Sequence, residues 1–88
     1  MVMYEIMFSR QAIKDIDKLK TKNLDKKAKS IIEILKNNPF QNPPPYEKLV
    51  GDLNGLYSRR INHKHRIWYS VDTTDKVIRI IRMWTHYE

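Results

Sequence analysis

The sequence contains no cysteine and no long hydrophobic run. The absence of thiols excludes disulfides and thiolate metal sites. Without an extended apolar run, we expect neither a signal peptide nor a membrane-spanning helix. We therefore expect a protein of the reducing cytoplasm with no membrane partner. Its 88 residues fit one domain over 1–88 with a modest core, because short chains bury a smaller share of their surface than long ones.

Negative charge is also scarce. Ten Asp and Glu oppose 17 Lys and Arg, which gives a formal net charge of +7. Such an excess attracts polyanions, and the phosphate backbone of nucleic acid is the most common large polyanion in a cytoplasm. Lysines that only solvate helix faces would produce the same composition. The charge therefore favours a nucleic-acid partner and leaves the reaction open.

The first half of the chain is predicted to form one strand and two helices. Residues 2–9 are rich in strand formers and end at Ser9, a preferred helix-capping residue. Helical spacing of apolar residues then predicts helices over 10–20 and 24–38, which the short connection makes antiparallel. The apolar positions of the first helix are Ala12, Ile13, Ile16 and Leu19. The charged residues in its remaining positions are Lys14, Asp15, Asp17 and Lys18.

The second half begins with an irregular segment over 38–55, which holds all four prolines and both glycines of the chain. We interpret it as an ordered loop, and loops of this length often carry function. Strand-like runs follow over 56–61, 65–72 and 76–84, separated by short breaks that suit hairpins. The order predicts an α+β domain in which two helices pack on one face of a four-stranded antiparallel β-α-α-β-β-β sheet.

Two arginines are predicted to meet on the open face of this sheet. Side chains alternate along a strand, so Arg59 and Arg60 point to opposite faces, and Arg66 faces away from a core that contains His65 and Tyr69. A neighbouring strand would then bring Arg60 beside Arg66. Two guanidiniums would form a phosphate pocket, because their planar forks suit phosphate oxygens. The alternative is that both arginines cover the sheet or pair with acidic residues.

Three further residues complete a set that RNA chemistry could use. Glu47 lies in the long loop just before the sheet, and His86 and Tyr87 follow the last strand. If the loop and the tail fold over the open face, these residues converge with the arginines. Cleavage of RNA without metal needs a base for the ribose 2′-hydroxyl, cations for the phosphorane and an acid for the leaving 5′-oxygen. Glu47 would be the base and His86 the acid.

Other polar and aromatic residues carry weaker signals. Lysines crowd the helices and would add RNA affinity without sequence choice, and Trp68 is either a base-stacking or a core residue. His63 and His65 share a face of an extended segment, but two ligands without a third are weak grounds for a metal site. We predict no metal and no cofactor. The predicted RNA-binding residues are Arg59, Lys48, Lys18, Lys22 and Lys26.

The residues 46–71, "YEKLVGDLNGLYSRRINHKHRIWYSV", together with "NPF" before them and "HY" at 86–87, resemble the YoeB (Txe) toxins of the RelE superfamily. The resemblance implies a RelE-like fold and a ribosome-dependent endoribonuclease that cuts messenger RNA in the ribosomal A site and inhibits translation. It also implies a cognate YefM-like antitoxin and the possibility of a homodimer. The catalytic residues that it implies are Glu47, Arg60, Arg66, His86 and Tyr87.

The chain departs from the family pattern at three positions. Lys48 and Val50 stand where the family usually has proline and lysine, and Glu88 follows Tyr87. Two other functions remain as alternatives. The same scaffold occurs in ParE-like inhibitors of DNA gyrase, and the positive charge would also suit a non-catalytic RNA- or ribosome-binding module. A gyrase inhibitor would not be expected to keep Glu47, Arg66 and His86, whereas a binding module needs only the lysines.

Overall fold

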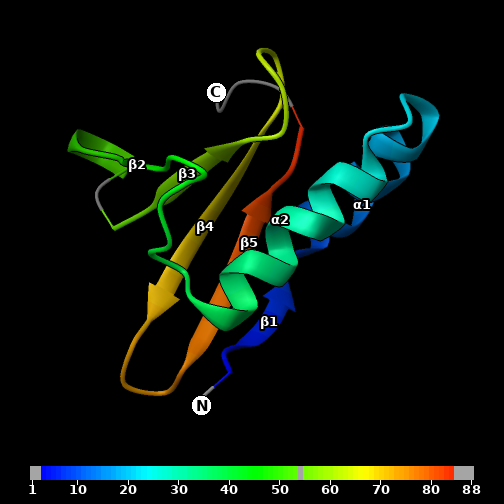
Figure 1. Ribbon diagram of the computed structural model, residues 1–88. Coiled ribbons are helices and arrows are strands. Elements are labelled where there is room, and N and C mark those ends of the chain that lie inside the picture. The colour runs from blue at the N-terminus through cyan, green and yellow to red at the C-terminus, as the bar shows by residue number, and fades with distance from the viewer. Residues whose placement is uncertain (1–2, 54, 85–88) are drawn as a thin grey trace.

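The computed structural model describes residues 3–53 and 55–84 (Figure 1). The predicted residues His86 and Tyr87 lie outside these ranges. The elements in chain order are β1 (Glu5–Phe8), α1 (Arg10–Thr21), α2 (Asp25–Asn37), β2 (Glu47–Lys48), the 3₁₀ turn η1 (Gly51–Leu53), β3 (Tyr57–Arg60), β4 (Arg66–Asp72) and β5 (Val77–Arg82). Within the described residues, neither helix has the length and hydrophobicity that crossing a bilayer requires.

The five strands form one mixed sheet in the order β1-β5-β4-β3-β2, with both helices on one face (Figure 1). The α+β class and the helical layer are as predicted, but the four-stranded antiparallel sheet is wrong in two respects. The long loop contributes the two-residue strand β2, and β1 pairs with β5 in parallel. The hairpins make β3, β4 and β5 antiparallel neighbours, whereas the two helices between β1 and the rest of the sheet return the chain so that β1 runs parallel to β5.

Local hydrogen bonds explain where the elements begin and turn. Ser9 caps α1 as predicted, because its Oγ accepts a hydrogen bond from the Ala12 amide at 3.0 Å. In the hairpin between β3 and β4, Asn62 Oδ1 accepts from the amides of Lys64 and His65, both at 2.8 Å. Asp72 makes equivalent contacts in the next hairpin. These short polar side chains replace backbone hydrogen bonds in the turns, which fixes the registers of the strands that carry the candidate site.

The core lies between the helices and the sheet. Its buried hydrophobic residues are Ala12, Leu19, Ala28, Ile31, Leu35, Ile61, Ile67, Tyr69, Ile78, Ile80 and Met83. The apolar stripe predicted for α1 needs one correction, because Ile13 is 56% exposed while Asp15 is fully buried. The buried face of α1 is centred on Ala12, Asp15 and Leu19, so an acidic residue occupies a position on the core face and an isoleucine faces solvent.

Candidate active site

The hairpin of β3 and β4 places two arginines side by side. Arg60 and Arg66 are directly opposite each other in the antiparallel register, as the alternation of side chains predicted. Their neighbours Arg59 and Ile67 are buried on the other face. The pair thus concentrates positive charge on the open face of the sheet, where facing side chains lie close enough to act on one ligand.

Glu47 joins this pair through the short strand β2. Its partner in the register is Ser58, which precedes the two arginines of β3 in the sequence. Glu47 Oε1 lies 3.3 Å from Arg66 Nη1, and the same nitrogen donates a hydrogen bond to Ser58 Oγ at 3.4 Å. The Glu47 side chain is 61% exposed and that of Arg66 22%. The carboxylate is therefore oriented by the guanidinium and remains open to a substrate.

These residues line a shallow depression of about 50 Å³. Pockets that enclose a small molecule are usually several hundred Å³, so this one suits a single group of a larger substrate. Within it, one exposed carboxylate stands beside cations with planar donor forks, an arrangement that can accept a proton and bind a phosphate group. The lining residues are Pro45, Tyr46, Glu47, Ser58, Arg60 and Arg66.

The chain beyond β5 starts beside the same arginine. The backbone amide of Arg66 donates a hydrogen bond to the Trp84 carbonyl at 3.0 Å, and Trp84 is the last residue that the structure describes. The Trp84 ring stacks on His65, with 4.3 Å between the ring centroids. The described chain therefore ends at the candidate site, two residues before His86.

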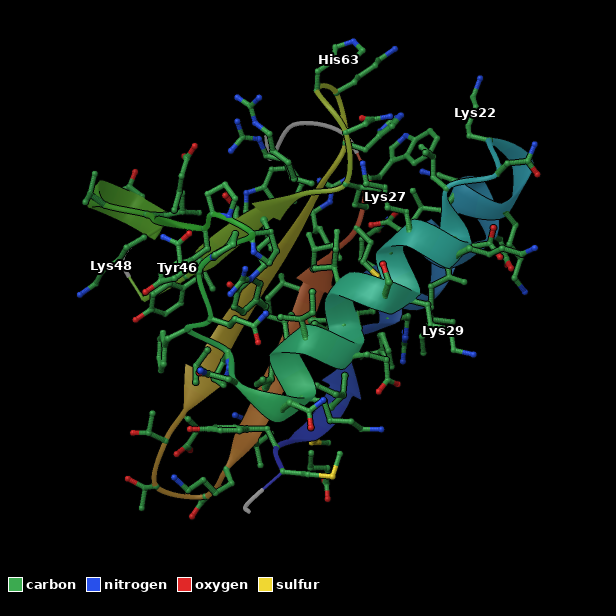
Figure 2. All side chains as sticks on the ribbon, in the orientation of Figure 1. Lys22, Lys27, Lys29, Tyr46, Lys48 and His63 are labelled. Atoms are coloured by element: carbon green, nitrogen blue, oxygen red, sulfur yellow. The ribbon has the colours of Figure 1, made fainter. Side chains whose placement is uncertain are left out.

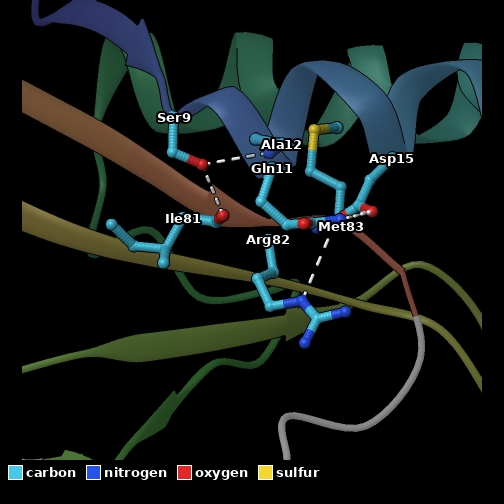
Figure 3. Close-up of polar contacts among 7 residues, drawn as sticks. All are labelled: Ser9, Gln11, Ala12, Asp15, Ile81, Arg82 and Met83. Carbon is cyan, nitrogen blue, oxygen red and sulfur yellow. Dashed lines mark hydrogen bonds and ion pairs between the residues drawn. The ribbon is translucent and has the colours of Figure 1, made fainter.

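A buried polar junction between α1 and β5 holds this end of the strand (Figure 3). Asp15 Oδ2 accepts a hydrogen bond from the Met83 amide at 3.0 Å and lies 4.0 Å from Arg82 Nε. At the N-cap of the same helix, Ser9 Oγ donates to the Ile81 carbonyl at 2.6 Å. The helical spacing assigns Asp15 to the polar positions of α1 and does not predict its burial, which no local pattern signals.

The structure divides the predicted RNA-binding lysines into separate groups. Lys18, Lys22 and Lys26 are exposed on or between the helices, and Lys48 is exposed on β2. Figure 2 shows Lys22 and Lys48 on opposite sides of the molecule. Lys18 approaches the end of the described chain, with its Nζ 5.9 Å from the centre of the Trp84 ring. Lys22 thus lies apart from Lys48, whereas Lys18 approaches the end of the described chain beside Arg66.

Two residues considered for RNA contact are buried. Arg59 is 1% exposed and Trp68 is 4% exposed. The assignment of Arg59 to RNA binding is therefore wrong, because its guanidinium is enclosed by the loop before β2 and cannot reach a phosphate. Trp68 is also covered, but alternation along β4 places it on the side of Arg66, opposite the core residues Ile67 and Tyr69.

His65 and His63 are not arranged as a pair of metal ligands. His65 is buried against Trp84, whereas His63 is exposed at the hairpin tip (Figure 2). Burial and then the charge of Lys64 lower the pKa of His65, so its neutral form is favoured. In the described ranges, no cluster of three His, Asp or Glu side chains could hold a metal ion.

A second and larger cavity, of about 730 Å³, lies between the helices and β1. It is lined by apolar residues such as Ile6, Phe8 and Ile32, and its charged residues are lysines and carboxylates in equal number. Its lining contains neither arginine nor histidine. The depression at Glu47 is therefore the better candidate for phosphate chemistry, although it is much smaller.

Comparison with known proteins gives a consistent result. Residues 8–87 match the family model of the YoeB-like toxin of bacterial type II toxin-antitoxin systems. The curated toxin YoeB of Synechocystis is 34% identical over 67 residues, which cover 76% of each chain. Two solved structures from Staphylococcus aureus, a YoeB-YefM heterotetramer and a YoeB dimer, are 37% identical, with TM-scores of 0.79 and 0.78 and coverage of 96% of this chain and 98% of theirs. The chain belongs to the YoeB-like toxin family, with the RelE-like fold that its sequence predicted.

Proposed function

We propose that this protein is the toxin of a type II toxin-antitoxin system and acts as an endoribonuclease that cuts messenger RNA in the ribosomal A site. The observation that carries the proposal is the contact of 3.3 Å between Glu47 Oε1 and Arg66 Nη1, with Arg60 directly opposite Arg66. An exposed carboxylate beside two cations supplies a base and a charged site for phosphate in one place. Membership of the YoeB-like family supports the same reaction.

The reaction is a transesterification within the RNA. Glu47 takes the proton of a ribose 2′-hydroxyl, whose oxygen then forms a bond to the adjacent phosphorus. Arg60 and Arg66 stabilise the negative charge that builds up on the phosphorane. The bond from phosphorus to the 5′-oxygen breaks, and His86 donates a proton to that oxygen. The upstream fragment keeps a 2′,3′-cyclic phosphate, and no step requires a metal.

Tyr87 and His86 enter this proposal from the sequence and from the family resemblance. The hydrogen bond of the Arg66 amide to the Trp84 carbonyl supports their role, because the chain leaves β5 next to the arginine that would hold the phosphate. Tyr87 would contact the substrate phosphate or stack on a base. The exposed lysines Lys18, Lys22 and Lys26 would strengthen binding to ribosomal RNA, and Lys48 would contact RNA from β2.

The partners follow from the same assignment. We infer a YefM-like antitoxin that neutralises the toxin, since a family relative from Staphylococcus aureus is known as a YoeB-YefM complex. A homodimer is a further possibility, because a YoeB dimer is known from the same organism. The messenger RNA and the ribosome would be the other partners, and translation places all of them in the cytoplasm.

Cleavage of a defined messenger RNA on programmed ribosomes tests the proposal. Glu47→Gln and His86→Gln should each lower the single-turnover rate by about 10²–10⁴-fold, the range for lost proton transfer. Arg79 is an exposed residue of β5 outside the site. The substitution Arg79→Lys therefore serves as the control for a change elsewhere on the sheet and should keep the wild-type rate. Analysis of the fragment ends should detect the cyclic phosphate.

The outcomes also separate the two alternatives. Wild-type protein that binds ribosomes and leaves the messenger intact would reject the nuclease and favour the RNA-binding module. Inhibition of DNA gyrase in a supercoiling assay, without cleavage of RNA, would favour the ParE-like alternative. Cleavage that survives both substitutions at full rate would reject the roles of Glu47 and His86.

A further inference from the structure

Arg59 is a buried cation whose position needs an explanation. Its side chain extends from β3 into the interior and is 1% exposed. A buried charge is strongly unfavourable unless polar partners replace the water that it loses. Arg59 has such partners: Nη2 donates to the carbonyls of Pro39 and Gln41 at 3.0 and 2.8 Å, Nη1 to the Pro44 carbonyl at 2.6 Å, and Nε to Tyr69 Oη at 3.2 Å.

Three of these partners belong to one short stretch of the loop. The carbonyls of Pro39, Gln41 and Pro44 span most of the segment that connects α2 to β2. The next aromatic residue in this segment, Tyr46, places its ring 5.0 Å from the Arg59 guanidinium carbon, which adds a cation–π contact. Arg59 thus joins three carbonyls and one ring of a loop that has no strand or helix of its own between 38 and 46, while Tyr57 of β3 packs against the rings of Phe40 and Tyr46.

The loop ends at the proposed base. Glu47 follows Tyr46 directly, and β2 contains only Glu47 and Lys48. A ladder of two residues is too short to hold a strand in place by itself. Because side chains alternate along β3, Arg59 holds the loop from the helix side of the sheet while Ser58 and Arg60 face Glu47 on the open side.

We propose that Arg59 is a positioning residue, which fixes the loop over 39–46 so that the Glu47 carboxylate stays at Arg66. The inference rests on the proposed function, since it gives the clamp a role in that reaction. A lysine would not replace the arginine, because an ammonium group concentrates its donors at one point, whereas the guanidinium spreads them over a plane and reaches carbonyls on several sides. The loop carbonyls lie around such a plane.

Arg59→Lys tests the clamp, with Arg79→Lys as the control for the loss of an arginine at an exposed position of the sheet. Cleavage is measured on programmed ribosomes at a temperature far below the melting transition of each protein. We expect kcat of Arg59→Lys to fall by about 10²-fold, the effect of a displacement of about 1 Å in a reacting group. KM should change by less than about threefold, because Arg59 touches no substrate.

Hydrogen exchange gives a readout that is independent of cleavage. The amides of Phe40 and Gln41 are hydrogen-bonded within the loop, to Asn38 Oδ1 and to the Asn38 carbonyl, both at 3.1 Å. In Arg59→Lys these amides should exchange at least about tenfold faster, while the amide of the buried Ile78 in β5 exchanges as in the wild type. A residue that only adds global stability would accelerate the loop and the core amides together.

Tyr69→Phe provides the second variant if Arg59→Lys does not fold. It removes one acceptor of the guanidinium and keeps the ring, so the same loop amides and kcat should change in the same direction by about threefold. Unchanged kcat in variants whose loop amides exchange faster would overturn the clamp as a positioning device. Unchanged exchange would overturn the clamp itself. If the wild type cuts no RNA, the proposed function fails, and the exchange result still decides whether Arg59 holds the loop.

Discussion

Replacement of Asp15 by leucine should destabilise this protein more than any exposed substitution. Asp15 is fully buried on α1, and its two carboxylate oxygens accept hydrogen bonds from Gln11 Nε2 at 2.9 Å and from the Met83 amide at 3.0 Å. Leucine removes both acceptors and leaves the Met83 N–H without a partner in the interior. Asparagine has nearly the same shape and keeps one oxygen for the amide.

The magnitude follows from these contacts. A hydrogen bond to a charged acceptor contributes about 1.5–3 kcal/mol, and an orphaned buried donor costs about 1–3 kcal/mol. Part of this is offset by the burial of a larger apolar side chain, so we expect Asp15→Leu to lower the free energy of unfolding by about 3–5 kcal/mol. At about 0.05–0.15 kcal/mol per residue, a chain of 88 residues has roughly 4–13 kcal/mol in total. Asp15→Asn should cost about 1–2 kcal/mol.

Urea unfolding followed by tryptophan fluorescence measures these differences. With a slope of about 2 kcal/mol per M, the midpoint for Asp15→Leu should fall by about 1.5–2.5 M, and that for Asp15→Asn by less than about 1 M. Asp17→Leu is the control, because Asp17 is exposed on the same helix and should change stability by less than about 0.5 kcal/mol. Equal midpoints for Asp15→Leu and Asp17→Leu would refute the reasoning, since the carboxylate would then contribute nothing at the junction.

Two smaller predictions test other features of the core. Burial, followed by the charge of Lys64, lowers the pKa of His65 in the folded protein from the ordinary value of 6.5. Between the folded and the unfolded pKa, the unfolded chain therefore binds more protons than the folded protein. The free energy of unfolding should rise with pH through this window and level off above 6.5. His65→Gln should remove that rise in denaturant titrations at a series of pH values. Ile13→Ala should cost less than about 0.5 kcal/mol, whereas Leu19→Ala should cost about 2–5 kcal/mol; similar melting curves for the two variants would contradict the correction to the α1 stripe.

Much of this fold could be predicted because its signals are local. The cap at Ser9, the two helices and the two hairpins depend on residues a few positions apart. The meeting of Arg60 with Arg66 follows from alternation along two strands that one short hairpin joins. Such features need only the period of the strand and the length of the turn.

The rest depends on contacts between distant parts of the chain. The parallel pairing of β1 with β5 joins the two ends of the fold, and nothing near Glu5 indicates it. The same holds for Asp15 and Arg59, because a charged residue at a core position is recognisable only when its partners are known. Met83, which donates its amide to Asp15, is 68 residues away in the sequence. The loop carbonyls that accept from Arg59 are 15 to 20 residues away from it.

Buried polar residues add hydrogen bonds at the margin of the core. A small domain has a modest core, and the segments that carry the candidate site, the loop before β2 and the end of β5, lie at its margin (Figure 1). Arg59 donates three hydrogen bonds to the loop, and Asp15 accepts the Met83 amide just after β5. Hydrogen bonds specify position more narrowly than apolar contact, because they weaken steeply with angle and distance. A change at either residue should therefore disturb the geometry around Glu47 or Trp84 before it abolishes the fold, provided that the replacement keeps the volume of the side chain.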